Sequence, residues 1–461
     1  MPNQLIKEQV DIDVCPTPGP ASPNLDGKQI TIGDLHGNAL KLMFMLVKQG
    51  IATIAPEHYQ RLVSIYRMDI RELTKAHLEA FNQILSGVTF QGHRLVRLLG
   101  DELADRGQND YFTLKILQKL HQAHVPVEII VSNHSLEFIH ACESKDLFEG
   151  TVIQPDQVKS MTNLQALVKK GIVDREEILQ IKRDCYNSTV RAISYSLGKD
   201  SPAITIYSHA GIGLNTIQDL AKKLSVLYSD KTASQLAHTI DNINRAFQQH
   251  VQGNTVHTLY EPNAIGELAD PGHDLDLGFF PLESLMWNRE YDHLWRPAAH
   301  HGYRLVFAHG HDAGELTHGN IINLDNILGK SLRSHKEEYT AVCSDEYDLK
   351  AQFLERLEAI AIKMKHLPPN GPAYRAADTL YKTVTGRYEA LKQSPVLMPA
   401  FQRSCQDAIS AARPALAVHR RTPFLFFMKT DFIHKLDRLA DAIACLPTPA
   451  EIENSSALRP A

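Results

Sequence analysis

The sequence has few cysteines, and none of them is paired at short spacing. The six cysteines lie far apart, without a Cys-x-x-Cys pair, which argues against a disulfide framework and a zinc knuckle. Neither sign of charge dominates, because 48 lysines and arginines face 53 aspartates and glutamates, so no footprint for nucleic acid or an anionic membrane is present. The longest apolar run, Phe424–Met428, is too short to span a bilayer, and the first 27 residues lack the apolar core of a secretory signal. We therefore expect a cytosolic protein without a transmembrane segment.

Changes in composition and in hydrophobic periodicity along the chain predict its domain organisation. Residues 1–27, rich in proline, are expected to form a flexible arm. Residues 28–331 carry the site-like motifs and predict one catalytic domain, with helical insertions at about 56–85, 145–200 and 214–252. The helical periodicity of 332–446 predicts an all-helical appendage, a candidate surface for a protein partner, and 447–461 are expected to be a disordered tail.

Two short apolar runs end in glycine and then in polar loops. Residues 95–99 lead into Gly100, Asp101, Asp105 and Arg106, and residues 29–32 lead into Gly33, Asp34 and His36. Carboxylates at the carboxyl end of a buried strand occupy the usual place of a ligand site in α/β proteins. Residues i and i+2 of an extended backbone point to the same side, so Asp34 and His36 can hold one metal ion.

Three further apolar runs end in the same kinds of side chain. They are followed by Asn133 and His134, by His209, and by His309 and His311. A single histidine of this kind is more often structural than a ligand, but five such strand ends in one chain predict a common site. The spacing alone leaves His309 and His311 as alternatives, because both face the same side of the strand end.

In their order along the chain, these motifs resemble the phosphoprotein phosphatase (PPP) family of metallophosphoesterases over about residues 28–330. The helical insertions and the appendage resemble the Wip-type effector phosphatases that intracellular bacteria inject into host cells. The resemblance implies an α/β fold, in which a metallophosphoesterase-type β-sandwich of mixed sheets is flanked by helices. It also implies a phosphoprotein substrate, phosphorylated on Tyr or on Ser/Thr.

The resemblance further implies two divalent metal ions, Mn with Fe or Zn as alternatives, and a set of site residues. The ligands would be Asp34, His36, Asp101, Asn133, His209 and His309, with Asp101 bridging the two ions and His309 favoured over His311 by the family register. Hydroxide held between the ions would attack phosphorus directly. His134, oriented and kept protonated by Asp105, would protonate the leaving oxygen, and Arg106 and Arg289 would bind the phosphate.

The chain departs from the family pattern in two places. Three residues separate Asp101 from Asp105 where the family has two, so we expect a bulge at Ala104 or a neighbour. Val131-Ser132-Asn133-His134-Ser135 stands where the family has Arg-Gly-Asn-His-Glu. The chain therefore lacks one phosphate-binding arginine and the trailing glutamate, for which Glu137 is a candidate substitute.

Three other functions compete with this interpretation. A dinucleotide-polyphosphate hydrolase of the same fold would use the same metal ligands, and a catalytically inactive binding module would use the appendage as its interface. Cys185 and Arg191 match the Cys-x5-Arg spacing of cysteine-based tyrosine phosphatases. That loop lacks glycine and carries Asp184 beside the thiol, which disfavours a phosphate-binding thiolate.

Overall fold

The computed structural model describes residues 3–17, 28–91, 94–143, 153, 156–199, 201–260, 280–289, 291–311, 317–345, 347–394, 398–418 and 431–446. The chain divides into two compact units. The sheet unit comprises Met1–Tyr228 and Ala246–Glu346, and the helical unit comprises Ser229–Arg245 and Tyr347–Ala461. No helix in the described ranges is both long and apolar enough to cross a membrane.

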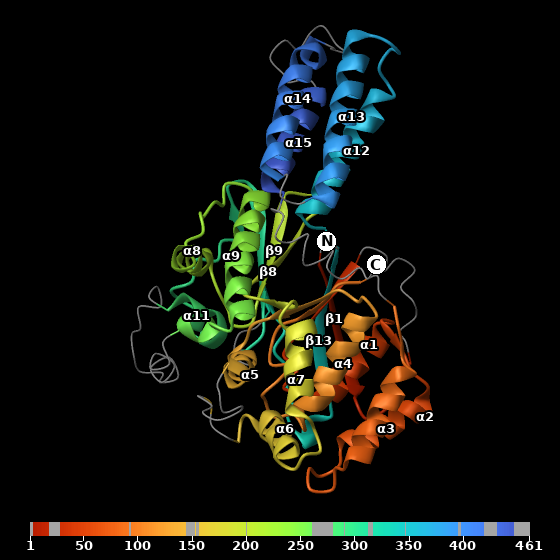
Figure 1. Cartoon of the computed structure of the whole chain (residues 1–461). Coiled ribbons are helices and arrows are strands. Elements are labelled where there is room, and N and C mark those ends of the chain that lie inside the picture. The colour runs from red at the N-terminus through yellow and green to blue at the C-terminus, as the bar shows by residue number, and fades with distance from the viewer. Residues whose placement is uncertain are drawn as a thin grey trace. The chain divides into compact units, whose positions relative to one another are not determined.

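The sheet unit is built around two mixed sheets (Figure 1). The first sheet has the strand order β1-β13-β2-β5-β6-β7; the second has the order β10-β11-β9-β8, with β12 beside β11, and β3 pairs with β4. The strands are β1 (Asn3–Asp11), β2 (Lys28–Ile32), β3 (Ala52–Thr53), β4 (Thr89–Phe90), β5 (Val96–Leu98), β6 (Val127–Ile130), β7 (Val190–Arg191), β8 (Ser194–Leu197), β9 (Ala203–Ser208), β10 (Ala299–His300), β11 (Tyr303–His309), β12 (Ile321–Asn323) and β13 (Lys336–Asp345).

Helices connect and flank these strands. They are α1 (Ala39–Lys48), α2 (Pro56–Tyr66), α3 (Lys75–Ser86), α4 (Asp110–Gln122), α5 (Asn133–Glu143), α6 (Lys159–Lys169), α7 (Arg175–Ile181), α8 (Leu214–Lys223) and α11 (Pro281–Trp287), with the π-helix η1 (Lys182–Tyr186) and the 3-10 helices η2 (Val256–Thr258) and η4 (Leu332–Ser334). Helices α1, α4 and α7 lie side by side in Figure 1, and α4 contacts both of its neighbours.

Parallel pairing determines where the motifs meet. β2, β5 and β6 are parallel neighbours in the first sheet, and β9 and β11 are parallel neighbours in the second. The carboxyl ends of each group therefore lie at one edge of their sheet, where ligand sites of α/β proteins are usually found. Buried side chains from both sheets join in one apolar cluster, formed by Leu99, Ile130, Tyr207, Ala308, Leu324 and Val342. This cluster holds the two sets of strand ends together.

The helix that follows the first motif begins at a side-chain cap. The Asn38 side chain accepts a hydrogen bond from the backbone N–H of Lys41 at 3.0 Å, which satisfies one of the free donors at the start of α1. Nine of its ten residues, from Ala39 to Val47, are buried. Because α1 is buried on all sides, it fixes the position of the preceding loop, which carries Asp34 and His36.

The helical unit has an apolar core of its own. It contains α12 (Leu349–Met364), α13 (Pro372–Gln393), α14 (Met398–Val418), α15 (Asp431–Cys445) and the first part of α9 (Ala233–Gly253). Phe353, Leu380, Cys405 and Leu436 belong to its buried core. Gly371 precedes the Pro372 that begins α13, as expected for proline in the first turn of a helix.

The structure corrects three of the expected boundaries. Residues 3–11, expected in a flexible arm, form the strand β1, which pairs along its length with β13. β13 extends the sheets to residue 345, beyond the predicted end of the catalytic domain at 331. The predicted helical insertion at 145–200 ends in the strands β7 and β8. β1 lies at the edge of its sheet, where charged side chains such as Lys7 and Glu8 can remain exposed. Its sequence therefore lacks the apolar pattern from which a strand is predicted. The predicted tail, 447–461, lies outside the described residues.

Candidate active site

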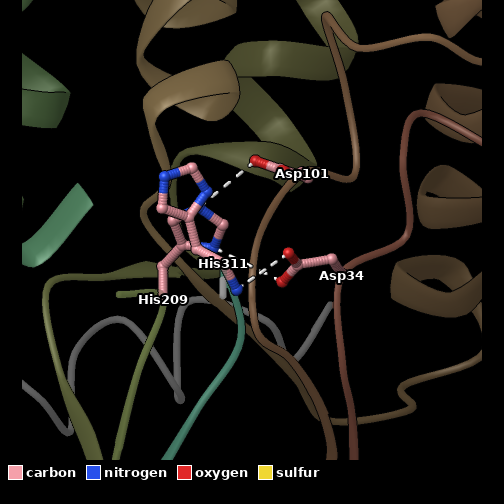
Figure 2. Close-up of side chains that lie close together, drawn as sticks. All are labelled: Asp34, Asp101, His209 and His311. Carbon is pink, nitrogen blue, oxygen red and sulfur yellow. Dashed lines mark hydrogen bonds and ion pairs between the residues drawn. The ribbon is translucent and has the colours of Figure 1, made fainter. Parts of the chain in front are cut away.

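Four buried side chains from four strand ends meet in one cluster. Asp34 follows β2, Asp101 follows β5, His209 follows β9 and His311 follows β11, and each offers a ligand atom within 4.8 Å of the others. Figure 2 shows both carboxylates pointing toward the two imidazole rings, whose centroids are 4.7 Å apart. Carboxylates and imidazoles together suit a transition-metal ion.

The cluster is charged, and its members shift one another's pKa values. His209 Nδ1 lies 3.5 Å from Asp34 Oδ1, and His209 Nε2 lies 3.5 Å from Asp101 Oδ1. Burial opposes the charged form of His209, but the two carboxylates raise its pKa to about 9. Burial likewise opposes ionisation of Asp34, yet His209 and His36 hold its pKa below the usual range. Burial together with the charge of His209 lowers the pKa of His311.

Acceptor oxygens converge around the His209 ring. Its Nδ1 donates a hydrogen bond to the Leu99 carbonyl at 2.7 Å, so Nε2 is the ring atom left to face Asp101 and, at 3.0 Å, the side-chain oxygen of Asn133. Within the described part of the chain, Oδ1 of Asp34 and Oδ1 of Asp101 are buried and accept no hydrogen bond. A cation would satisfy these atoms, so the residues fit the metal site implied by the motifs.

A second group of potential ligands shares Asp101 with the first. It contains His36, Asp101 and Asp105, all buried. His36 Nε2 donates to the Asn326 carbonyl at 2.6 Å, and its Nδ1 lies 3.3 Å from Asp105 Oδ2. Two overlapping groups with one common carboxylate are the arrangement that a bridged pair of ions requires.

His311, rather than His309, occupies the cluster. The backbone N–H of His311 donates to Asp34 Oδ2 at 3.0 Å, whereas His309 Nδ1 contacts the Gly310 carbonyl at 2.9 Å. Gly310 makes the approach possible, because a Cβ at this position would lie 2.1 Å from Asp34 Oδ1. The two histidines therefore occupy different environments, although the sequence spacing treats them alike.

The loop after β5 contains two residues other than glycine with a positive φ. Ala104 has a φ of +53° and Asp101 a φ of +52°, both in the left-handed region that is uncommon for residues other than glycine. His134 Nδ1 donates to the Ala104 carbonyl at 2.6 Å, and His134 Nε2 lies 3.4 Å from Asp105 Oδ1. Burial lowers the pKa of His134, but Asp105 and Asp101 raise it more. Ala104 thus orients the ring, and Asp105 favours its protonated form.

The two arginines expected at the phosphate lie at different depths. Arg106 is partly buried, donating to Asp105 Oδ1 at 3.0 Å and to the Gln157 side chain at 3.2 Å. Arg289 is exposed, and its Nη2 lies 3.4 Å from His311 Nε2. Arg289 therefore stands beside the cluster, whereas Arg106 stands beside the His134–Asp105 pair.

Several buried polar residues around the site were not found from the sequence. The Lys41 ammonium donates to the Asp34 carbonyl at 2.5 Å and to the Asn326 side chain at 2.9 Å. Burial lowers its pKa to about 8, although nearby carboxylates oppose the shift. A lysine within a helix carries no sequence signal for this role, because its partners lie in loops distant in sequence.

Glu102, and not Glu137, provides the carboxylate next to Ser135. The Ser135 hydroxyl donates to Glu102 at 2.9 Å, and the Tyr186 hydroxyl donates to the same carboxylate at 2.5 Å. Glu137 instead accepts from the backbone of Ile153. The family's trailing glutamate is thus replaced by a serine that contacts a carboxylate of the neighbouring loop.

The Cys185–Arg191 segment does not form a phosphate-binding loop. Cys185 lies in the π-helix η1, where burial raises the pKa of its thiol to about 11. The Arg191 guanidinium donates to the backbone carbonyls of Ser188 and Val190. A nucleophilic cysteine requires a lowered pKa, so this arrangement opposes the cysteine-based mechanism.

Comparison with known proteins shows which family the chain belongs to. The family model described as "WipA-like, phosphatase domain" matches residues 95–330. Among solved structures, the chain is similar to the phosphatase domain from the Legionella effector WipB, with a TM-score of 0.58 and 34% sequence identity, over 62% of this chain and 99% of that chain. A comparison with curated protein sequences found no match. Since the family model spans more than half of the residues and the WipB domain is covered almost completely, the chain belongs to the family of WipA-like phosphatase domains.

Proposed function

We propose that this protein is a phosphoprotein phosphatase that depends on two divalent metal ions and hydrolyses phosphomonoesters on Tyr or on Ser/Thr. The observation that carries the proposal is the pair of buried ligand groups that share Asp101, in a chain of the WipA-like phosphatase family. The first group, with Asn133 beside His209, would hold one ion, and His36, Asp101 and Asp105 would lie around the other, whereas the family register groups Asp34 with His36. We further propose that the two sheets form the β-sandwich of metallophosphoesterases.

When bound, the ions would neutralise phosphate oxygens and lower the pKa of the water that attacks phosphorus. The chain's own residues supply the other requirements. Arg289, exposed beside the cluster, and Arg106 bind the phosphate oxygens through their planar guanidinium groups. His134 donates the proton of Nε2 to the leaving oxygen, because its Nδ1 is bonded to the Ala104 carbonyl, and the adjacent Asp105 stabilises the protonated ring.

Phosphate release by the purified full chain tests the proposal. The chain is stripped with a chelator, reloaded separately with Mn, Fe or Zn, and assayed on phosphotyrosine, phosphoserine and phosphothreonine peptides and on a dinucleotide polyphosphate. We expect metal-dependent release from phosphopeptides. Cleavage of the dinucleotide alone would instead support the hydrolase, and inactivity on every substrate would support an inactive binding module.

Two substitutions sharpen this assay. Asp101→Asn removes the shared carboxylate charge and should lower turnover by about a hundredfold or more. Asp69→Asn is the matched control, because Asp69 is half-buried and its side chain bonds only to the neighbouring Arg71. Full activity of Asp101→Asn would contradict the two-metal mechanism.

We also propose that the protein acts as an effector in a host cell, supported by its similarity to a domain of the Legionella effector WipB. Fusing the full chain to a reporter that gives a signal only in host cytosol tests this. Secretion-dependent signal is the expected result, and a signal no greater than that of a non-secreted reporter would contradict it.

A further inference from the structure

Ala104 links the acid candidate His134 to a buried carboxylate. The Ala104 carbonyl accepts the hydrogen bond from His134 Nδ1, and the Ala104 N–H points at both oxygens of Asp110, at 3.1 and 3.0 Å. Asp110 is fully buried at the start of α4. The orientation of His134 therefore depends on the position of Ala104, and Asp110 fixes that position by accepting hydrogen bonds from the Ala104 N–H.

Ser160, the second residue of α6, contacts this arrangement at three points. Its N–H donates to the Asp105 carbonyl at 2.8 Å, and its hydroxyl oxygen accepts from the Asp105 N–H at 2.9 Å. The hydroxyl hydrogen is then free to donate to Asp110, with which Ser160 forms a side-chain hydrogen bond. One fully buried serine thus satisfies both backbone groups of Asp105 and the carboxylate that holds Ala104.

The space around the Ser160 hydroxyl is tight. A Cβ on Gly37, in the loop that carries Asp34 and His36, would lie 2.8 Å from this oxygen. A Cβ on Gly107 would lie 1.8 Å from the Gly37 carbonyl. The two loops therefore touch backbone to backbone, and Ser160 packs where they meet. A larger side chain would displace one of the loops.

We propose that Ser160 is a positioning residue for proton transfer, which holds the Ala104–Asp105 segment so that His134 faces the leaving oxygen. The inference rests on the proposed phosphatase function and assigns a role to α6, which lies in the predicted helical insertion. A backbone carbonyl can orient an imidazole only if the backbone itself is held, and a loop segment with a positive φ is not held by regular secondary structure.

A series of aryl phosphates separates this role from simple loss of stability. Poor leaving groups, as in phenyl phosphate, need a proton in the transition state, whereas 2,4-dinitrophenolate leaves without one. We expect His134→Ala to lower kcat on phenyl phosphate by about a hundredfold or more and Ser160→Ala by about tenfold. Both variants should retain kcat on 2,4-dinitrophenyl phosphate and bind the metal ions like the wild type. Thr162→Ala is the matched control, because the Thr162 hydroxyl bonds only to the Val158 carbonyl of its own helix.

A double variant makes the test specific. If Ser160 acts through His134, Ser160→Ala should have no further effect on phenyl phosphate turnover in the His134→Ala background. A uniform loss over all leaving groups, or additive effects in the double variant, would overturn the inference while leaving the phosphatase function intact. A metal-loaded wild type that hydrolyses no phosphate ester would overturn both.

Asp110→Asn provides a second route if Ser160→Ala does not fold. The amide keeps the shape of Asp110, but it has one acceptor oxygen in place of two, so Ala104 and Ser160 would compete for that oxygen while the NH2 group repels the other donor. The variant should show the same selective loss on phenyl phosphate. Wild-type leaving-group dependence in a folded Asp110→Asn protein would contradict the inference.

Discussion

The guanidinium carbon of Arg97 lies 4.1 Å from the ring centroid of Tyr207, so a side chain of β5 reaches a strand of the other sheet. Arg97 also donates to Glu128, to Ser194 and to Thr31, and only 1% of its side chain is exposed. A charged residue between two sheets, with a partner on every side, stabilises the fold only while all partners are present.

Arg97→Ala should therefore lower the free energy of unfolding by about 3–5 kcal/mol, because it removes a fully buried cation and the hydrogen bonds that it donates to Gln29, Thr31 and Ser194, whereas Glu128 keeps the hydrogen bond from Ser194. Urea denaturation followed by circular dichroism measures this. Arg71→Ala, which breaks an exposed pair with Asp69, should change stability by less than about 1 kcal/mol. Equal effects of the two substitutions would show that the Arg97 network is not stabilising.

Gly310→Ala should remove activity without unfolding the protein. The added Cβ would displace Asp34, and a shift of about 1 Å at a reacting site is enough for a loss of about a hundredfold. Phosphate release and calorimetric titration with Mn both measure the effect, and weaker metal binding is expected. Gly386→Ala is the control, because a Cβ there meets nothing within 4 Å. Unchanged metal affinity in Gly310→Ala would contradict the assignment of Asp34.

The pH dependence of stability should carry a contribution from Asp110. Burial raises the pKa of this carboxyl group from 3.8 to about 7, so between these pH values the folded chain keeps a proton that the unfolded chain releases. The stabilisation is complete below about pH 4 and falls by about 1.4 kcal/mol per pH unit until pH passes 7. Relative to Asp110→Asn, the wild type should therefore lose stability across this range. A constant difference in unfolding free energy from pH 4 to 8 would contradict the shift.

Cys185→Ser should leave phosphatase activity near the wild-type level, because the buried thiol has a raised pKa and faces no phosphate-binding loop. Chelation of the wild type should abolish activity. Phosphate release measures both effects. An inactive but folded Cys185→Ser protein, together with a wild type that keeps its activity after chelation, would reverse the assignment.

How much the sequence predicts depends on whether a residue's partners are near it in the chain. Asp34, Asp101 and His209 each follow an apolar strand, so a local pattern was enough to select them, and parallel strand order brings them together. His309 and His311 could not be separated, because a turn with φ of +56° at His311 determines which one faces Asp34. The sequence around Ser160, Lys41 and Tyr186 does not indicate their roles. Each of them bonds to residues that are distant in the sequence, in loops or in another element.

The fold, too, was predicted where local sequence determines an element and missed where distant residues determine it. The helices α2 and α3 occur where the pattern predicted an insertion, because their apolar faces repeat at helical spacing. The strand β1 was missed because its hydrogen bonds go to β13, more than 300 residues later in the chain, and its side chains are largely polar. Long-range pairing of an edge strand leaves little trace in the local sequence.

Helix α9 determines where the chain can be cut. Ser234 bonds to Gln352 and His238 bonds to the Cys445 carbonyl, so residues 229–245 belong to the helical unit although 246–346 belong to the sheet unit. Truncation after residue 346 would remove α12 to α15 but leave the first half of α9, in which Ser234 and His238 would lose their hydrogen-bond partners. A fragment restricted to the sheet unit would therefore need residues 229–245 replaced by a short linker as well.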